Sequence, residues 1–253
     1  MSTLWEGMLK QIVKEYQAFP ASFLRQPTIS KTTHPNVQDL AALYYSDLTE
    51  SSFFNEQILP GLKDGLVGQP FQFKQLPECS PLTIQHAYHL NLIREHLGIF
   101  IPSGQISRIV EIGGGYGNLC RLVKQFGYAG TYTIVDFPQM LQLQQHYLKQ
   151  NAIAGIEFAT LDESRLFLPS SDTSILIATF SVNEMPMESR KILEDQYNQY
   201  NYLFFAYNTA FDGINNIEYF NELQSKLDPF FETQLIKDKY KNSWFMLCKK
   251  RVK

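Results

Sequence analysis

A glycine-rich turn stands between two apolar segments of this chain. The segment reads IVEIGGGYGNLC, and its acidic residue Glu111 is followed by Gly113, Gly115 and Gly117 at alternate positions. Glycine lets a backbone approach a ligand closely. The next apolar segment, TYTIVDFP, ends at Asp136, 19 residues after Gly117. Ligands of open α/β sheets bind beyond the carboxyl ends of the strands, so the two segments together predict a nucleoside-binding edge.

The glycine spacing separates two classes of cofactor. A dinucleotide fingerprint G-x-G-x-x-G would need a third glycine, but Asn118 or Cys120 stands there, depending on the frame. S-Adenosylmethionine has no pyrophosphate, so its loop must admit an amino acid and a ribose. The Glu111 carboxylate can meet the ligand's ammonium, and Asp136 can accept hydrogen bonds from both ribose hydroxyls. An acidic residue at position 136 would also suit NAD. Only the combination of the glycine spacing, Glu111 and Asp136 favours S-adenosylmethionine.

Strand-like and helix-like segments alternate from Ile106 onward. Apolar runs predict strands at Arg108–Ile112, Thr131–Val135, Ile156–Phe158, Ser174–Ala178 and Tyr202–Ala206. Helices are expected between them, at Asn118–Phe126, Gln139–Lys149, Met187–Tyr200 and Ile214–Leu227. Strands separated by helices indicate a parallel sheet, and the final runs TQLIK and SWFMLCKK indicate an antiparallel edge hairpin. The predicted fold class is α/β: a Rossmann-like, seven-stranded, mostly parallel sheet with a C-terminal hairpin.

The first part of the chain is predicted to be mostly helical. Its best-bounded helix lies in SPLTIQHAYHLNLIREHLG, where Ser80 can cap, Pro81 suits the first turn and Gly98 suits a left-handed exit. The alternating FQFKQL predicts a short strand or extended segment. We therefore expect a helical region over residues 1–105 that covers the acceptor, the molecule that reacts with the cofactor. A cofactor-binding domain is expected over residues 106–253.

At these motifs the sequence resembles the class I S-adenosylmethionine-dependent methyltransferases. VEIGGGYGNL resembles their first motif and YTIVDFP their second, and the resemblance extends from about Ile106 to the C-terminus. Within that superfamily, EIGGGYG, VDFP and SVNEMP behind a helical N-terminal half are most similar to the bacterial sugar O-methyltransferases. The resemblance implies an α/β methyltransferase fold, S-adenosylmethionine as cofactor and a sugar-containing acceptor.

The same resemblance implies individual ligand roles. It places Glu111, the three alternating glycines and Asp136 against the cofactor, together with Phe137, which follows in the motif. It also places an acidic residue after the third strand near the adenine, where ATLDES offers Asp162 beside Glu163. Taken alone, Asp162 in a polar loop is more often a turn or helix cap.

Transfer of a methyl group to a hydroxyl is an in-line displacement that a general base or a metal ion assists. Plant-type methyltransferases share the VDxP motif but use a His–Asp pair that this chain lacks, so their base does not transfer. After the fourth strand SVNEMP presents Asn183 and Glu184, and Glu184 is the first candidate for the base. Its alternative role is to stabilise the N-terminus of the following helix. His86 and His89, three residues apart on one helix, are secondary catalytic candidates, with partly exposed helix positions as the alternative.

Several further residues are weaker candidates. Phe180 suits a cavity wall or the core, and YNTAFDG presents Tyr207, Asn208 and Asp212 for acceptor recognition or ordinary loop hydrogen bonding. Glu184, Asp212 or Asp162 could ligate a divalent metal, but no spacing identifies such a site, so the metal stays unknown.

Composition limits the partners and the compartment. The 253 residues are 44% hydrophobic and carry a net charge of −3, which gives no electrostatic reason to expect nucleic acid. The three cysteines lie far apart without metal-ligand spacing, and the first residues lack the order of a signal peptide. No apolar run is long enough to span a bilayer. We expect a cytoplasmic protein whose first helix packs on protein, with an interfacial membrane helix or a homodimer contact as alternatives.

These observations favour an S-adenosylmethionine-dependent O-methyltransferase whose acceptor is a sugar or a sugar-containing small molecule. One alternative is a methyltransferase for another small-molecule or protein acceptor. A second is a non-catalytic subunit that keeps the cofactor fold, which would not need Glu111, Asp136 and the glycines together. A nicotinamide oxidoreductase is the third, and the incomplete fingerprint opposes it.

Overall fold

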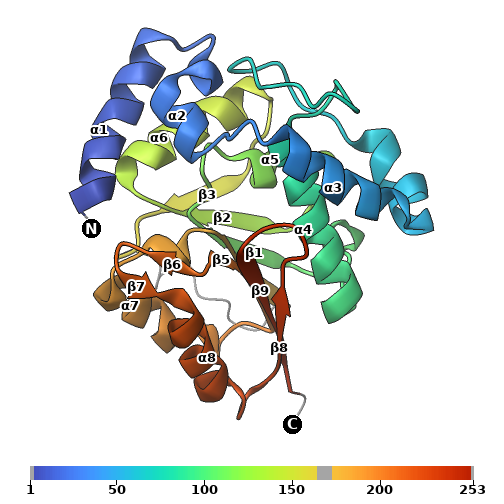
Figure 1. The fold of residues 1–253 in the computed structure, drawn as a ribbon, viewed down its shortest axis with the longest axis vertical. Helices are drawn as coiled ribbons and strands as arrows, with labels where there is room; N and C mark the ends of the chain where they lie inside the picture. Colours follow the sequence, from blue (N-terminus) through green and yellow to red (C-terminus); the bar gives the residue numbers. More distant parts are fainter. Residues whose placement is uncertain (1–2, 164–172, 252–253) are drawn as a thin grey trace.

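The protein is built around one seven-stranded sheet. A computed structural model describes residues 3–163 and 173–251. The strand order is β3-β2-β1-β4-β5-β9-β8 (Figure 1). The strands are β1 (Arg108–Ile112), β2 (Thr131–Val135), β3 (Ile156–Ala159), β4 (Ser174–Thr179), β5 (Tyr202–Asn208), β8 (Phe231–Lys237) and β9 (Ser243–Lys250). The first five run parallel, and β9 is antiparallel to both β5 and β8. The predicted fold class is confirmed.

Helices cover both faces of the sheet. The helices that connect the strands are α5 (Asn118–Gln125), α6 (Pro138–Gln150), α7 (Met187–Tyr197) and α8 (Asn216–Leu227). Apolar side chains of α5 and α6 pack in one buried cluster with Ile109 and Ile134, whereas those of α7 and α8 pack in another with Val110. Successive strand residues point to opposite faces, so β1 supplies both clusters.

The N-terminal region is helical, as predicted. Its elements are α1 (Thr3–Ala18), η1 (Phe23–Arg25), α2 (Pro27–Thr32), α3 (Gln38–Thr49), η2 (Phe54–Ile58), η3 (Leu59–Gly61), α4 (Pro81–Leu97) and η4 (Ile101–Ser103). Ser80 caps α4 by accepting from the Thr83 amide, and Gly98 ends it at φ 71°. Buried side chains of this region share a cluster with α5, α6 and the sheet, and Figure 1 shows these helices gathered on that side.

Three details of the sequence prediction were wrong. FQFKQL forms only an isolated bridge between Phe73 and Leu76, because the chain turns at Lys74–Gln75 and the Leu76 amide donates to the Phe73 carbonyl at 3.2 Å. Helix α7 ends at Tyr197 rather than Tyr200. Residues 210–215 form a small hairpin of β6 (Ala210–Phe211) and β7 (Ile214–Asn215) before α8 begins.

This small hairpin has a local cause. Its turn is Asp212–Gly213, and both residues have positive φ, 48° and 78°. A two-residue turn with positive φ at both positions is the form that Asp-Gly favours, because it matches the twist of the paired strands.

Two further properties concern the helices and the cysteines. Among the helices of the described ranges, none has the length and apolar character needed to cross a membrane. Cys79, Cys120 and Cys248 are all buried and free.

Candidate active site

A cavity of about 690 Å³ opens at the carboxyl ends of the parallel strands. This volume lies within the usual range for small-molecule sites. The segments that follow β1, β2, β3 and β4 contribute to its wall, as do the last residue of β5, α2, α4 and the N-terminal end of α1. The residues predicted for the site that line it are Glu111, Gly113, Gly115, Asp136, Phe137, Asp162, Phe180, Glu184, His86, His89 and Asn208.

The three alternating glycines have different environments. All three have positive φ: 72° at Gly113, 56° at Gly115 and 98° at Gly117. A Cβ on Gly113 would overlap Ser181, whereas one on Gly115 would meet only Thr33, at 3.7 Å. Gly117 does not line the cavity; it precedes α5, and a Cβ there would press on Leu148 of α6 at 3.3 Å. The loop therefore faces the cavity at two glycines and packs against a helix at the third.

Asp136 directly follows β2, and each oxygen of its carboxylate accepts a hydrogen bond. Oδ1 accepts from the Phe137 amide at 2.8 Å, and Oδ2 accepts from Gln144 Nε2 at 2.7 Å. Gln144 Nε2 also donates to the Gly115 carbonyl at 3.0 Å, so one buried amide ties the acid to the glycine loop. Burial raises the pKa of Asp136 to about 7, against the lowering effect of these hydrogen bonds.

Glu111 lies inside the wall at the end of β1. Its side chain is 1% exposed, and Oε2 accepts from the Tyr132 hydroxyl at 2.8 Å. Burial raises the pKa of Glu111 to about 7, and the nearby Asp136 charge adds to this, while the Tyr132 hydrogen bond opposes it. The two carboxylates thus form an acidic side of the cavity. Beyond β3, Asp162 lines the same side, whereas Glu163 turns back to accept from Thr160.

His86 and His89 face the cavity from α4 and are buried rather than partly exposed. His86 Nδ1 lies 3.1 Å from Asn118 Nδ2, so the amide donates to it and the ring proton is assigned to Nε2. Burial lowers the pKa of His86 to about 3. Burial also lowers the pKa of His89 far below its usual value, and neither of its ring nitrogens has a partner among the described residues. Both rings are therefore neutral at physiological pH.

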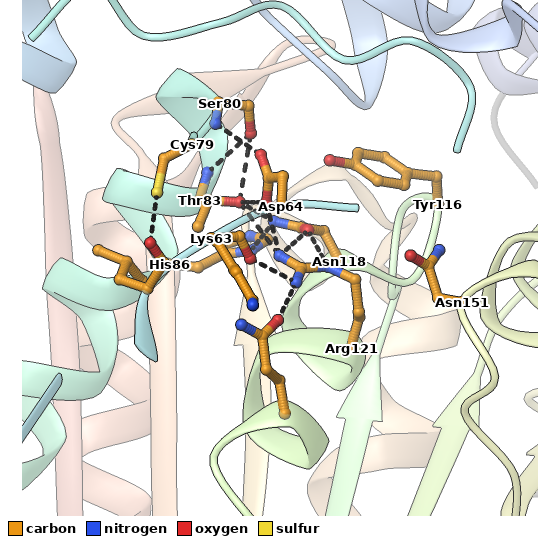
Figure 2. A network of polar contacts seen from close by, with 12 residues as sticks. Lys63, Asp64, Cys79, Ser80, Thr83, His86, Tyr116, Asn118, Arg121 and Asn151 are labelled. Atoms are coloured by element: carbon orange, nitrogen blue, oxygen red, sulfur yellow. Dashed lines mark hydrogen bonds and ion pairs between the residues drawn. The ribbon is translucent and has the colours of Figure 1, made fainter. Parts of the chain in front are cut away.

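A buried polar network orients His86 (Figure 2). Arg121 of α5 pairs with Asp64, 2.6 Å apart, and both side chains are at most 5% exposed. Arg121 Nε also donates to Asn118 Oδ1 at 3.1 Å, which fixes the Asn118 amide with its nitrogen toward Thr83 and His86. The segment before α4 and the start of α5 together therefore fix the orientation of the His86 imidazole.

Glu184 reaches the cavity from η6 (Val182–Glu184), just after β4. The Trp5 indole donates a hydrogen bond to its carboxylate. Burial raises the pKa of Glu184 to about 7; the Trp5 hydrogen bond and the positive charge of Lys241 act in the other direction. Asn183 does not line the cavity: its side chain is fully buried behind the wall, and its carbonyl accepts from Arg190 at 2.7 Å.

Two acceptor-recognition candidates lie elsewhere. Tyr207 is buried with its ring stacked 3.8 Å from that of Phe220, and Asp212 forms the small hairpin turn. His96, on the same helix as the other two histidines, contacts Gln234 outside the cavity. In the part of the chain that the structure describes, no group of three or more His, Cys, Asp or Glu side chains is placed to hold a metal ion.

Sequence analysis did not identify the wall residues Trp5 and Lys241, or Gln144, which holds Asp136 without lining the cavity itself. The sequence does contain a signal for Gln144, because it is a polar residue on a buried helical face that also carries Met140 and Tyr147. Trp5 and Lys241 come from the two ends of the chain, and no local pattern marks them as site residues.

Comparisons with known proteins give similarities in architecture only. No family model and no curated protein sequence matches this chain. Among solved structures, an S-adenosylmethionine-dependent methyltransferase from Aquifex aeolicus is 14% identical, over 66% of this chain and 97% of its own, with a TM-score of 0.48. An O-methyltransferase family protein from Burkholderia thailandensis is 10% identical, over 89% and 77%, with a TM-score of 0.46. An rRNA methylase from Streptococcus thermophilus is 12% identical, over 68% and 97%, with a TM-score of 0.46. Likeness at this level does not identify the activity or the acceptor of this chain.

Proposed function

We propose that this protein is an S-adenosylmethionine-dependent O-methyltransferase that acts on a hydroxyl of a sugar or a sugar-containing small molecule. One observation carries the proposal: the same cavity is lined by a glycine loop, the buried Glu111, the half-buried Asp136, two neutral histidines and the Glu184 carboxylate. The glycine loop and the first two carboxylates suit the cofactor, and the histidines and Glu184 suit an acceptor hydroxyl.

The glycine loop and the acidic residues beside it fit S-adenosylmethionine, which supplies an electrophilic methyl group when bound. Asp136 would accept from the ribose hydroxyls, and Glu111 would meet the ammonium. Gly115 leaves the loop open on the cavity side. Phe137 and Asp162 would border the adenine. Gly117, which packs against α6, would shape the loop rather than touch the cofactor.

Glu184 would take the proton from the acceptor hydroxyl. A pKa of about 7 leaves much of this carboxylate ionised at neutral pH and makes it a stronger base than an exposed carboxylate. The Trp5 indole would hold the carboxylate in place. His89, neutral and with free ring nitrogens, would accept or donate one hydrogen bond to the acceptor.

Polar groups in the remaining wall support a polyhydroxylated acceptor. Gln85 and Asn208 line the cavity beside Glu184 and the histidines. Val37 and Leu40 line it from the N-terminal region, which supports the proposal that residues 1–105 cover the acceptor and help to exclude water.

A methyl-transfer assay tests the proposal. Protein and S-adenosylmethionine with a labelled methyl group would be offered monosaccharides, sugar acids, sugar phosphates and sugar nucleotides, with catechol and a protein mixture as other acceptor classes. We expect label on a sugar oxygen, located by mass spectrometry. Glu184→Gln should lower kcat by roughly 10²- to 10⁴-fold, the usual contribution of a general base. Label on catechol or protein alone would refute the sugar acceptor, and no transfer to any acceptor would favour a non-catalytic subunit.

A further inference from the structure

Lys241 brings a positive charge without a close anionic partner to the cavity wall. It belongs to the segment between β8 and β9, lines the cavity and is partly buried. In the described ranges no carboxylate lies within ion-pair distance of its ammonium, and no hydrogen bond from it is found. Its closest characterised contact is the Phe180 ring, with Nζ 4.0 Å from the centroid. Burial lowers the pKa of Lys241, although the charges of Asp238 and Glu184 oppose this.

The two carboxylates near Lys241 already accept hydrogen bonds from other residues. Asp238 is 4% exposed and accepts from the Tyr44 hydroxyl, from the Tyr240 amide at 2.9 Å and from the Ser243 hydroxyl at 3.0 Å. The Glu184 carboxylate accepts from the Trp5 indole. A partly desolvated ammonium is costly without a close anion, and an aromatic face offsets only part of that cost.

The strand order places Lys241 on the acceptor side of the cavity. Along the sheet edge, Asp162, Asp136 and the glycine loop follow β3, β2 and β1, whereas Lys241 comes just before β9. From β1 to β9 there are three strand spacings, or roughly 14 Å at about 4.8 Å per spacing. Glu184 follows β4, between these two sides.

Phe180 is held in an unusual conformation at this point. Its φ is 61°, and its amide donates to the Ala206 carbonyl of β5 at 2.8 Å. Positive φ is strained for a bulky residue, and such strain clusters at functional sites. Here it sets the ring between the Lys241 ammonium and His89, whose ring centroid is 6.0 Å away.

We propose that Lys241 binds an anionic group, a carboxylate or a phosphate, on the acceptor whose hydroxyl is presented to Glu184. The acceptor is then a sugar acid or a sugar phosphate rather than a neutral sugar. This inference rests on the proposed function, because it assumes that the cofactor occupies the glycine-loop side. The anion would supply the close partner that the ammonium lacks, and it would select acceptors by charge.

Calorimetry with three sugars of one hexose skeleton tests the inference. Glucuronate, glucose 6-phosphate and glucose would be titrated into protein saturated with S-adenosylhomocysteine. The wild type should bind at least one anionic sugar about tenfold or more tightly than glucose, as expected for a charge-assisted hydrogen bond. The two anionic sugars distinguish a carboxylate site from a phosphate site. Lys241→Gln should abolish the preference.

Lys239→Gln is the matched control. Lys239 lies in the same segment, is exposed, and pairs at 3.1 Å with Asp47 outside the cavity, so its variant should keep the preference. Equal binding of all three sugars, no binding of either anionic sugar, or a preference that survives Lys241→Gln would overturn the inference. Weaker binding of S-adenosylhomocysteine by Lys241→Gln would also overturn it, because the lysine would then serve the cofactor. If the wild type fails to bind S-adenosylhomocysteine, the proposed function fails and the inference falls with it.

Discussion

At the scale of single residues, three carboxylates in one cavity share a raised pKa for one physical reason. Burial disfavours the charged forms of Glu111, Asp136 and Glu184 and brings the pKa of each to about 7. Their partners differ: a tyrosine hydroxyl for Glu111, a backbone amide and Gln144 for Asp136, and an indole for Glu184. Shared burial with distinct partners is compatible with distinct roles, two in binding and one in proton transfer.

The raised pKa of Glu111 predicts that stability without cofactor falls as pH rises. The folded state holds the Glu111 proton more tightly than the unfolded chain does. The stability that this protonated carboxyl group contributes to the folded state is therefore complete below about pH 4.5 and is lost as pH rises through about 7. Glu111→Gln, which cannot ionise, should raise the free energy of unfolding at pH 8 by roughly 2–3 kcal/mol and change it little at pH 4. Urea denaturation at both values measures this. The exposed Glu188→Gln is the control, and equal effects of the two variants would contradict the prediction.

The proposed role of Glu184 in proton transfer predicts that kcat falls at acid pH. The carboxylate must be ionised to accept a proton, so kcat should rise with pH through about 7 and then level off. Measuring kcat from pH 5 to 9 at saturating cofactor checks this. A rate independent of pH below 7 would argue against Glu184 as the base.

Of the residues that the sequence predicts to bind the cofactor, all except Gly117 line the cavity. Gly113, Gly115 and Asp136 reach the cavity because they lie in the segments that follow β1 and β2 at the predicted edge of the sheet. Gly117 instead packs on Leu148 of α6, a contact that depends on how a later helix docks. Lys241 could not be placed, because only the pairing of β9 with β5 brings it to the site.

At the scale of elements, α1 contacts Glu184, the proposed general base, through a side chain near its N-terminal end. Trp5 near the start of α1 bonds Glu184 and lies 6.3 Å from the Phe137 ring, between ring centroids. The indole hydrogen bond lowers the pKa of Glu184, so Trp5→Phe should move the midpoint of the kcat profile to higher pH. Trp244→Phe, in β9, is the control that leaves the midpoint in place. An unchanged midpoint in Trp5→Phe would mean that α1 does not tune the base.

The Asp64–Arg121 pair joins the segment before α4 to α5. Removing one partner of a buried pair leaves an uncompensated charge, so Asp64→Asn should cost about 3–5 kcal/mol of unfolding free energy. Lys239→Gln, which breaks the exposed pair with Asp47, should cost at most about 1 kcal/mol. Urea denaturation compares them. Similar small costs would show that the buried network does not hold these elements together.

Element prediction succeeded where burial and periodicity agreed. The strands of the parallel sheet are near-continuous apolar runs, and α4 carries cap residues at both ends. It failed at FQFKQL, where a turn at Lys74–Gln75 interrupts the alternating segment. The small hairpin was missed although its Asp212–Gly213 turn is a local signal, because the segment was assigned to the start of α8.

At the scale of the whole molecule, one buried cluster spans the N-terminal helices and one face of the sheet. We therefore predict that residues 1–105 and the sheet unfold together. The chain has two tryptophans, Trp5 in α1 and Trp244 in β9, so Trp5→Phe and Trp244→Phe each leave one reporter. Urea denaturation followed by fluorescence should give one shared midpoint for both variants, after correction for their stabilities by far-ultraviolet circular dichroism. Separate midpoints for the fluorescence of Trp5 and the circular dichroism would contradict a single cooperative unit.

We propose that the glycine loop and Asp136 bind S-adenosylmethionine, and calorimetric titration with S-adenosylhomocysteine measures that binding. We expect micromolar affinity for the wild type, at least tenfold weaker binding by Asp136→Ala, and no binding of NAD. Binding of NAD alone, or binding of S-adenosylhomocysteine that Asp136→Ala leaves unchanged, would contradict this proposal.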